Sequence, residues 1–152
     1  MRNQSEPMSE PFINTEMLIP IFYQRIHQLE TNPCQDDREL EHLIKSYAAL
    51  RNTSLEKLSD RLCIARRTLS RFWVKTDARP RISNVVAVCL ELRMPPYLSR
   101  RVLSLTGLSL RETPQERAYE VLIESFSFCG VLVCNQLLLY HKLTPFPYME
   151  QD

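Results

Sequence analysis

Apolar residues recur along most of the chain at intervals of three and four positions, which is the spacing of one face of an α-helix. The clearest run follows the acidic residues Asp36 and Asp37, which suit a first helical turn, and consists of Leu40, Leu43, Ile44, Tyr47 and Ala48. Similar runs predict further helices over 15–30, 55–62, 66–74, 82–90, 97–105, 114–126 and 131–143. The pattern therefore predicts an all-α protein.

Capping residues and prolines mark where these helices begin and end. Thr53 and Glu56 match a T-x-x-E capping box, with Thr53 as the cap of a short helix that buries Leu55, Leu58 and Leu62. The other expected boundaries are a cap at Ser83, a stop at Pro95–Pro96, a C-cap at Gly107 and a start at Thr113–Pro114.

Composition excludes several classes of protein. With 44% hydrophobic and 24% charged residues among 152, the chain has an ordinary globular composition for one domain, or for one small domain with an appendage. Its two glycines, Gly107 and Gly130, cannot form a phosphate-binding loop, which excludes P-loop and dinucleotide fingerprints. The three histidines lie far apart, and no nucleophile elbow is visible. We therefore expect no enzyme, no metal site and no cofactor.

The cysteines and the most apolar stretch of the chain indicate in which cellular compartment the protein resides. Five cysteines without a C-x-x-C pair indicate a reduced, cytoplasmic protein, and we expect them to be small buried residues in helices. The stretch from Val121 to Leu143 contains Glu124, Lys142 and Gly130, so it is too interrupted to cross a membrane. We expect two packed helices around Gly130 and no membrane partner.

Charge is segregated along the chain, although the formal net charge is only +1. Residues 1–43 contain three arginines against eight acidic residues, whereas residues 61–101 contain ten basic residues against two acidic ones. Nine of those ten are arginine, whose planar donor fork suits phosphates and guanine edges. The central segment is therefore a candidate surface for binding a polyanion.

Two short predicted helices in this segment are joined by only three residues, Cys63-Ile64-Ala65, which is typical of a helix-turn-helix. If Leu69, Phe72 and Trp73 face the core, the opposite face of the second helix carries Arg67, Ser70, Arg71 and Val74, with Arg66 beside them at its start. Such a helix fits the major groove of B-DNA, and arginine can bridge the O6 and N7 atoms of guanine. The loop beyond it places Lys75, Arg79 and Arg81 where they would reach phosphates.

The run from Leu58 to Phe72 resembles the two central helices of the lambda-repressor-like, XRE-type helix-turn-helix regulators of bacteria and phages. The resemblance continues through Arg79-Pro80-Arg81-Ile82-Ser83 and covers roughly residues 37–105 as a five-helix domain. It implies a homodimer that binds double-stranded DNA sequence-specifically and regulates transcription in a bacterium or a mobile element. The DNA-binding residues that we expect are Arg66, Arg67, Thr68, Ser70, Arg71, Lys75, Arg79 and Arg81, of which Arg66, Arg67 and Arg71 would reach bases.

Three positions differ from the usual pattern of that family. Cys63 stands in the turn where many members have glycine, Ala65 stands where Ser or Thr caps the second helix, and Leu55 replaces a glutamine that touches phosphate. These differences favour an alternative function, in which the fold serves as a protein-interaction module, such as an antitoxin-like or phage-defence adaptor, that does not read DNA.

The predicted organisation has three parts. Residues 1–35 form a mobile arm with one short helix, residues 36–107 form the helix-turn-helix domain, and residues 108–152 form a C-terminal helical extension. The adjacent apolar residues Leu137, Leu138, Leu139 and Tyr140 make this extension the candidate for dimerisation, with burial inside one chain as the equal alternative.

Overall fold

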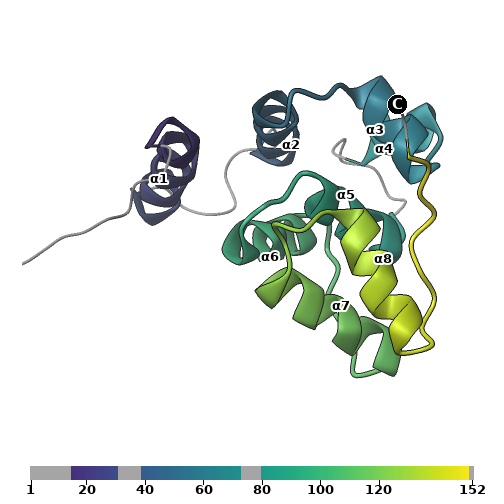
Figure 1. The fold of residues 1–152 in the computed structure, drawn as a ribbon. Coiled ribbons are helices and arrows are strands. Elements are labelled where there is room, and N and C mark those ends of the chain that lie inside the picture. The colour runs from purple at the N-terminus through teal and green to yellow at the C-terminus, as the bar shows by residue number, and fades with distance from the viewer. Residues whose placement is uncertain (1–14, 31–38, 73–79, 151–152) are drawn as a thin grey trace, which may run out of the picture. The chain divides into compact units, whose positions relative to one another are not determined.

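The computed structural model describes residues 15–30, 39–72 and 80–150, and within these ranges every regular element is a helix (Figure 1). The all-α prediction is thus confirmed for the part of the chain that is described. Expectations for Asp36, Asp37, Trp73, Val74, Lys75 and Arg79, and for residues 1–14, fall outside these ranges.

The chain divides into two compact units, Met1–Asp36 and Asp37–Asp152. The described part of the first unit is α1 (Thr15–Glu30), a helix that continues through Pro20. The second unit contains α2 (Glu39–Leu50), α3 (Leu55–Leu62), α4 (Arg66–Arg71), α5 (Ile82–Glu91), α6 (Pro96–Leu105), α7 (Pro114–Ser125) and α8 (Val131–Tyr140).

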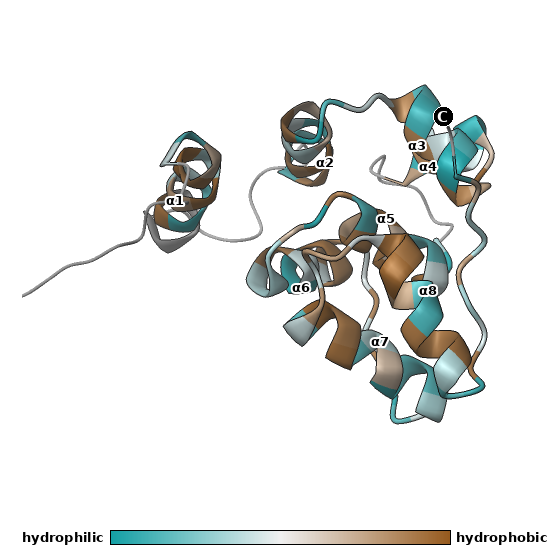
Figure 2. Ribbon diagram, in the orientation of Figure 1, coloured by the Kyte–Doolittle hydropathy of each residue, from teal (hydrophilic) through white to brown (hydrophobic). Residues whose placement is uncertain are grey.

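Helix α5 is the centre of the second unit. Every residue from Val85 to Leu90 is buried, and α5 contacts α3, α6, α7 and α8. A helix segment that is apolar on all sides must be covered on all sides, which explains why α3, α6, α7 and α8 all pack against it (Figure 2). Full burial of one Val or Leu side chain contributes about 1.5–3 kcal/mol, so α5 supplies much of the core stability.

Helix α2 buries the apolar face that its spacing predicts, with Leu40, Leu43, Ile44 and Tyr47 all covered. Its first residue, Glu39, accepts two hydrogen bonds from the guanidinium of Arg101 on α6, at 2.7 and 2.8 Å. Beyond its other end, Arg51 donates from Nε to the carbonyl oxygen of Leu92 at 3.1 Å. Both ends of α2 are therefore tied to the region of α5 and α6.

Two of the predicted caps are wrong. The N-cap of α3 is Ser54, whose hydroxyl accepts from the backbone N–H of Lys57, and not Thr53. The backbone N–H of Thr53 instead donates to the carbonyl of Ala48 at 2.9 Å and completes the end of α2, whereas α3 itself spans the predicted range 55–62. Helix α5 begins at Ile82 after Arg81, without a side-chain cap, so Ser83 lies inside the helix.

Pro96 is the first residue of α6, as predicted, but α5 already ends at Glu91 with Leu92 as its C-cap, so Pro95–Pro96 is not what stops that helix. The C-cap of α6 is Thr106, and the predicted cap residue Gly107 lies one position later with φ 75°. The Thr113 hydroxyl accepts from the N–H of Glu116 at the start of α7.

Helix α8 ends three residues earlier than its apolar run predicts. Lys142 adopts a left-handed conformation with φ 60°, and the Leu143 N–H bonds back to the carbonyl of Leu138. The following segment, residues 143–150, runs back toward α3, where the N–H of Met149 donates to the carbonyl of Arg61 at 2.7 Å (Figure 1).

The cysteines only partly match expectation. Cys89 in α5 and Cys134 in α8 are buried, and this burial raises the pKa of each thiol to about 12. Cys63 is exposed in a turn and Cys129 is half-buried in a loop, so the prediction of buried helical residues is wrong for these two. The described cysteines are all free thiols.

Candidate functional site

The connection between α3 and α4 is a turn of three residues, Cys63 to Ala65. Cys63 ends α3 in the left-handed conformation, with φ 56° and ψ 36°. Its N–H bonds to the carbonyl of Ser59. A side chain in this conformation costs roughly 1–2 kcal/mol, which glycine would avoid. The turn therefore forms at a local cost that the packing around it must offset.

Ser59 holds this turn from inside the core, a role that apolar spacing alone does not predict. Its hydroxyl donates to the carbonyl of Ile64, and its own carbonyl accepts the N–H of Ile64 at 3.1 Å. Ser59 and Ile64 are both buried. A serine at one position of an apolar helical face is the only signal that could have indicated this role.

Leu69 and Phe72 anchor α4 to the core, and both are buried as their spacing predicts. Its N-cap is Ala65, which makes no side-chain cap hydrogen bond. The structure describes α4 as Arg66–Arg71, so the last part of the predicted helix 66–74 lies outside the described residues.

The face of α4 that points away from the core carries the predicted site residues. Arg66, Arg67, Thr68 and Arg71 are exposed, which agrees with their spacing. Ser70 is only half-exposed, and its hydroxyl donates to the carbonyl of Arg67 at 3.1 Å. The hydroxyl of Ser70 thus forms its hydrogen bond within α4.

Arg81 is also exposed, and it immediately precedes α5. Lys75 and Arg79 fall in the segment that the structure does not describe, so their expected phosphate contacts stay predictions.

The arginines of α4 differ in their electrostatic surroundings. Arg66 lies 3.7 Å from a carboxylate oxygen of Glu56, and both side chains are more than half exposed. An ion pair of this kind contributes about 0–1 kcal/mol and weakens with salt. Within the described ranges, no carboxylate forms a salt bridge with Arg67 or Arg71, or with Arg81.

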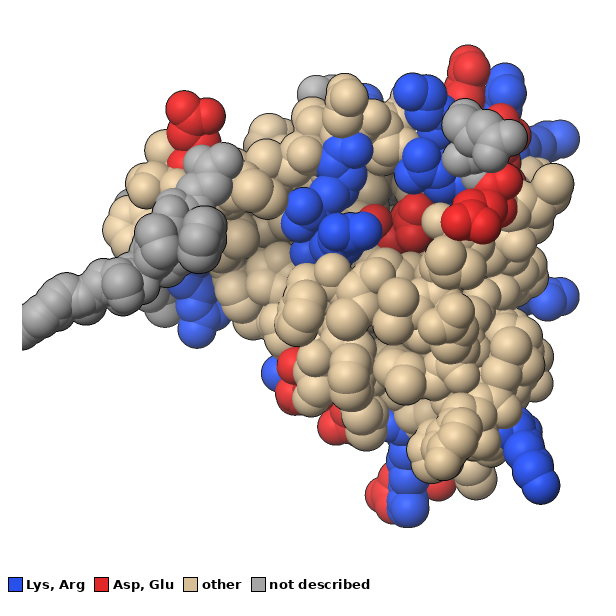
Figure 3. Space-filling view, viewed as in Figure 1, with Lys and Arg blue, Asp and Glu red and all other residues tan. Residues whose placement is uncertain are grey.

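Several other arginines of the basic segment 61–101 are engaged inside the unit. Arg61 pairs with Glu91 at 3.3 Å, Arg100 pairs with Glu124, and Arg101 pairs with Glu39. Figure 3 shows blue side chains over the α3–α4 end of the unit with red ones among them. Arg61, Arg100 and Arg101 are therefore each paired with a carboxylate of the same unit.

Glu91 connects the α3–α4 pair to the rest of the unit. One oxygen of its mostly buried carboxylate accepts from Arg61 on α3, and the other accepts from the backbone N–H of Val131 at the start of α8, at 3.3 Å. Tyr148 donates its hydroxyl to the same carboxylate at 3.2 Å. Burial and the nearby Glu91 raise the pKa of Tyr148. One side chain of α5 thus fixes α3, α8 and the C-terminal segment together.

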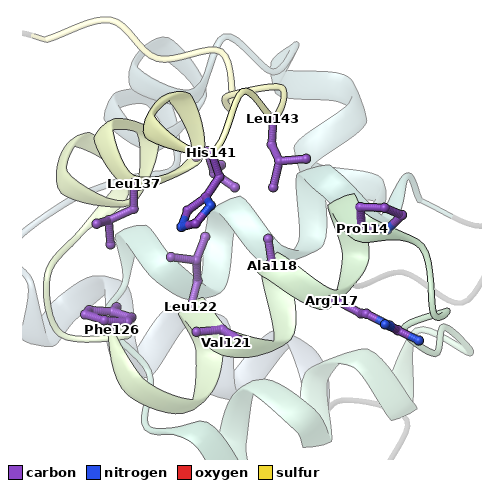
Figure 4. Close-up of a pocket in the computed structure, with 10 residues that line it drawn as sticks. Pro114, Arg117, Ala118, Val121, Leu122, Phe126, Leu137, His141 and Leu143 are labelled. Atoms are coloured by element: carbon purple, nitrogen blue, oxygen red, sulfur yellow. The ribbon is translucent and has the colours of Figure 1, made fainter.

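A pocket of about 490 Å³ lies between α7 and α8 (Figure 4). Leu122 and Val121 of α7 line one side, and Leu137 of α8 lines the other. The imidazole of His141 points into the pocket, whereas the guanidinium of Arg117 extends away from it toward Glu112. A small-molecule site usually has several convergent polar groups, and this lining offers one.

Other kinds of site find no support in the described residues. They contain no group of three or more His, Cys, Asp or Glu side chains that could hold a metal ion. None of the helices searched is both long enough and apolar enough to span a membrane. The chain matches no family model, no curated protein and no solved structure.

Proposed function

We propose that this protein is a cytoplasmic, sequence-specific double-stranded DNA-binding protein that regulates transcription in a bacterium or a mobile element. In this proposal α3 and α4 act as a helix-turn-helix, and α2 to α6 form a domain of the lambda-repressor-like type. The observation that carries it is the opposite exposure of the two sides of α4. Arg67 and Arg71 are exposed on one side, whereas Leu69 is buried on the other. A cationic face on a firmly seated helix suits the major groove.

Each predicted DNA-binding residue has an expected role. Arg66, Arg67 and Arg71 would reach base edges, where a bidentate arginine contact with guanine discriminates by about 1–3 kcal/mol. Thr68 and Ser70 lie on the same helix, with Thr68 the more accessible of the two. The phosphate contacts are assigned to Lys75, Arg79 and Arg81, which would set the register on the duplex but not the sequence read.

The Arg66–Glu56 pair is compatible with this function. Both groups are exposed, so separating them costs about 1 kcal/mol or less. A base or phosphate contact by Arg66 would replace the lost pairing.

The proposal is tested by selecting binding sites from a pool of random duplexes. The full chain and the triple variant R66A/R67A/R71A are compared at low salt, and Arg117→Ala serves as a control because Arg117 is exposed on α7. We expect one enriched sequence for the wild type and for the control, and none for the triple variant. Enrichment that is unchanged in the triple variant, or none in the wild type, contradicts the proposal.

The second candidate is a protein-interaction module that keeps the same fold. The observation that favours it is that Arg61, Arg100 and Arg101 are paired with carboxylates of the same unit, which reduces the positive charge available to a polyanion. In that case, random duplex DNA would fail to shift the protein at low salt, whereas non-specific electrostatic binding should be strong under those conditions if DNA is the partner.

A further inference from the structure

Residues 143–150, which we call the C-terminal strap, form no helix and bond to α8, α7, α5 and α3 in turn (Figure 1). Thr144 and Phe146 each precede a proline, which biases both residues toward extended backbone. Pro145 and Pro147 have a fixed φ and no N–H to donate. The strap is therefore extended because of its own sequence, and it loses little conformational freedom when it binds a surface.

Two side-chain amides hold the backbone of the strap. Asn135 of α8 accepts from the N–H of Phe146 at 2.7 Å and donates to the carbonyl of the same residue at 2.8 Å. Gln115 of α7 makes the same pair of bonds with Thr144, at 3.0 and 2.7 Å. A neighbouring β-strand would make such bonds to alternate residues along one edge of an extended chain. The two helices therefore recognise an extended backbone, independently of most of its side chains.

The side chain of Phe146 adds a contact that depends on sequence. It is 3% exposed and stacks on Tyr119 of α7, with the ring centroids 5.1 Å apart. A buried aromatic anchor beside bonds to the peptide backbone is a recurring form of peptide recognition. Gln115, Tyr119 and Asn135, which we call the strap site, therefore select an extended segment with one aromatic residue between two prolines.

The far end of the strap is joined to α3. Tyr148 donates to the carboxylate of Glu91, which also accepts from the guanidinium of Arg61. The N–H of Met149 donates to the Arg61 carbonyl at 2.7 Å. That carbonyl lies in the last turn of α3, where helix carbonyls have no partner within the helix. Departure of the strap would therefore remove two contacts just before Cys63, in the turn that leads to α4.

We propose that the strap site is a peptide-binding site. The strap occupies it in the structure, and a free peptide of the same pattern, extended and with an aromatic anchor between two prolines, binds there in its place. The strap contains no helical residue, so it can leave the site without breaking a helix. Peptide binding is independent of DNA, whereas its consequence for α4 rests on the proposed function.

Isothermal titration calorimetry of the full chain without DNA tests the proposal, with an acetylated peptide of residues 143–150 as the probe. The resident strap competes at an effective concentration on the order of millimolar, so the wild-type chain should bind this peptide weakly. Phe146→Ala in the chain removes the anchor of the strap but keeps the strap site. We expect this variant to bind the peptide at least about tenfold more tightly than the wild type does. A peptide with Phe146→Ala should bind neither chain.

Two adjacent amides of α8 provide a matched pair of variants. In the Phe146→Ala chain, the additional change Asn135→Ala removes both bonds to the peptide backbone and should weaken peptide binding about tenfold. Gln136→Ala, at the neighbouring exposed position, should leave peptide binding unchanged. Circular dichroism of each variant establishes that the helices are intact.

Tyr148→Phe provides a second test in a chain that keeps the Phe146 anchor. It removes only the hydrogen bond to Glu91, so it should loosen the strap and tighten peptide binding about fivefold. The proposal is overturned if a folded Phe146→Ala or Tyr148→Phe chain binds the peptide no more tightly than the wild type does, or if Asn135→Ala leaves binding unchanged. Because DNA is absent, a chain that binds the peptide but selects no duplex would contradict only the proposed function.

Discussion

The hydroxyl of Tyr148 lies 3.2 Å from the carboxylate of Glu91, which joins the C-terminal segment to the last residue of α5. The same carboxylate oxygen is 3.3 Å from the guanidinium of Arg61 on α3. The α3–α4 pair is therefore connected through one acidic side chain to a segment almost ninety positions further along the chain.

Replacement of Glu91 should destabilise the whole second unit. Glu91→Ala removes the acceptor for three donors and should lower the free energy of unfolding by about 2–4 kcal/mol. Tyr148→Phe removes one of those hydrogen bonds and should cost about 1 kcal/mol. Urea denaturation measures both, with Glu120→Ala on the exposed face of α7 as the control. A Glu91→Ala midpoint equal to that of the control would contradict the role given to this carboxylate.

Stability should fall in alkaline solution because of the buried thiols. The pKa of Cys89 is raised to about 12 from 9.0. As pH rises through 9, the unfolded chain releases a proton that the folded chain retains, so the free energy of unfolding decreases until the folded thiol also ionises near 12. The stability that this thiol provides is therefore fully present below pH 9.

Cys89→Ala should reduce the slope of the free energy of unfolding against pH in this window by about 1.4 kcal/mol per pH unit. Denaturation under reducing conditions at successive pH values gives the slope. Val88→Ala leaves a cavity in the same helix without removing a thiol, so it should lower stability but keep the wild-type slope. Equal slopes of the free energy of unfolding against pH for the wild type and both variants would contradict the role given to the Cys89 thiol.

A substitution in the turn between α3 and α4 should stabilise the folded protein. Cys63→Gly removes a left-handed penalty of about 1–2 kcal/mol and adds about 0.5–1 kcal/mol of backbone entropy in the unfolded state, so it should stabilise the protein by about 0.5–1 kcal/mol. Cys63→Val should destabilise it, because a β-branched residue tolerates positive φ poorly. Thermal denaturation of the two variants should bracket the wild type, and the reverse order would disprove the strain at this residue.

The sequence predicts features whose cause is local. The buried face of α2 follows from apolar spacing, and the starts of α6 and α7 follow from Pro96 and from Thr113 beside Pro114, since each of these residues acts within its own turn. Exposure of Arg67 and Arg71 follows from the same periodicity once Leu69 is placed in the core.

The sequence-based predictions are wrong where contacts with other segments of the chain determine the local structure. The end of α2 takes up the N–H of Thr53, which shifts the cap to Ser54. The inward pairing of Arg61 with Glu91 and the return of Met149 to α3 join residues far apart in the sequence, and no local pattern encodes them. Charge counted along the chain likewise gives no indication that Arg61, Arg100 and Arg101 are paired with carboxylates.

Arg81 gives a prediction specific to phosphate contact. Arg81→Ala should weaken binding equally for all DNA sequences and reduce the slope of log affinity against log salt by about 1. Titrations of the selected duplex and of an unrelated duplex at several salt concentrations measure this effect, with the exposed Arg111→Ala as the control. A change in base preference would instead assign Arg81 to the bases.

We propose that α4 reads bases directly, and the variant Arg67→Ala removes one of the side chains expected to do so. Affinities of the wild type, Arg67→Ala and Arg117→Ala, two variants with the same change in charge, are measured on the selected duplex and on its single-base variants. We predict that Arg67→Ala loses about 1–3 kcal/mol on the selected duplex and no longer distinguishes one base pair, whereas Arg117→Ala keeps the wild-type preference. An unchanged base preference in Arg67→Ala would contradict direct base readout by Arg67.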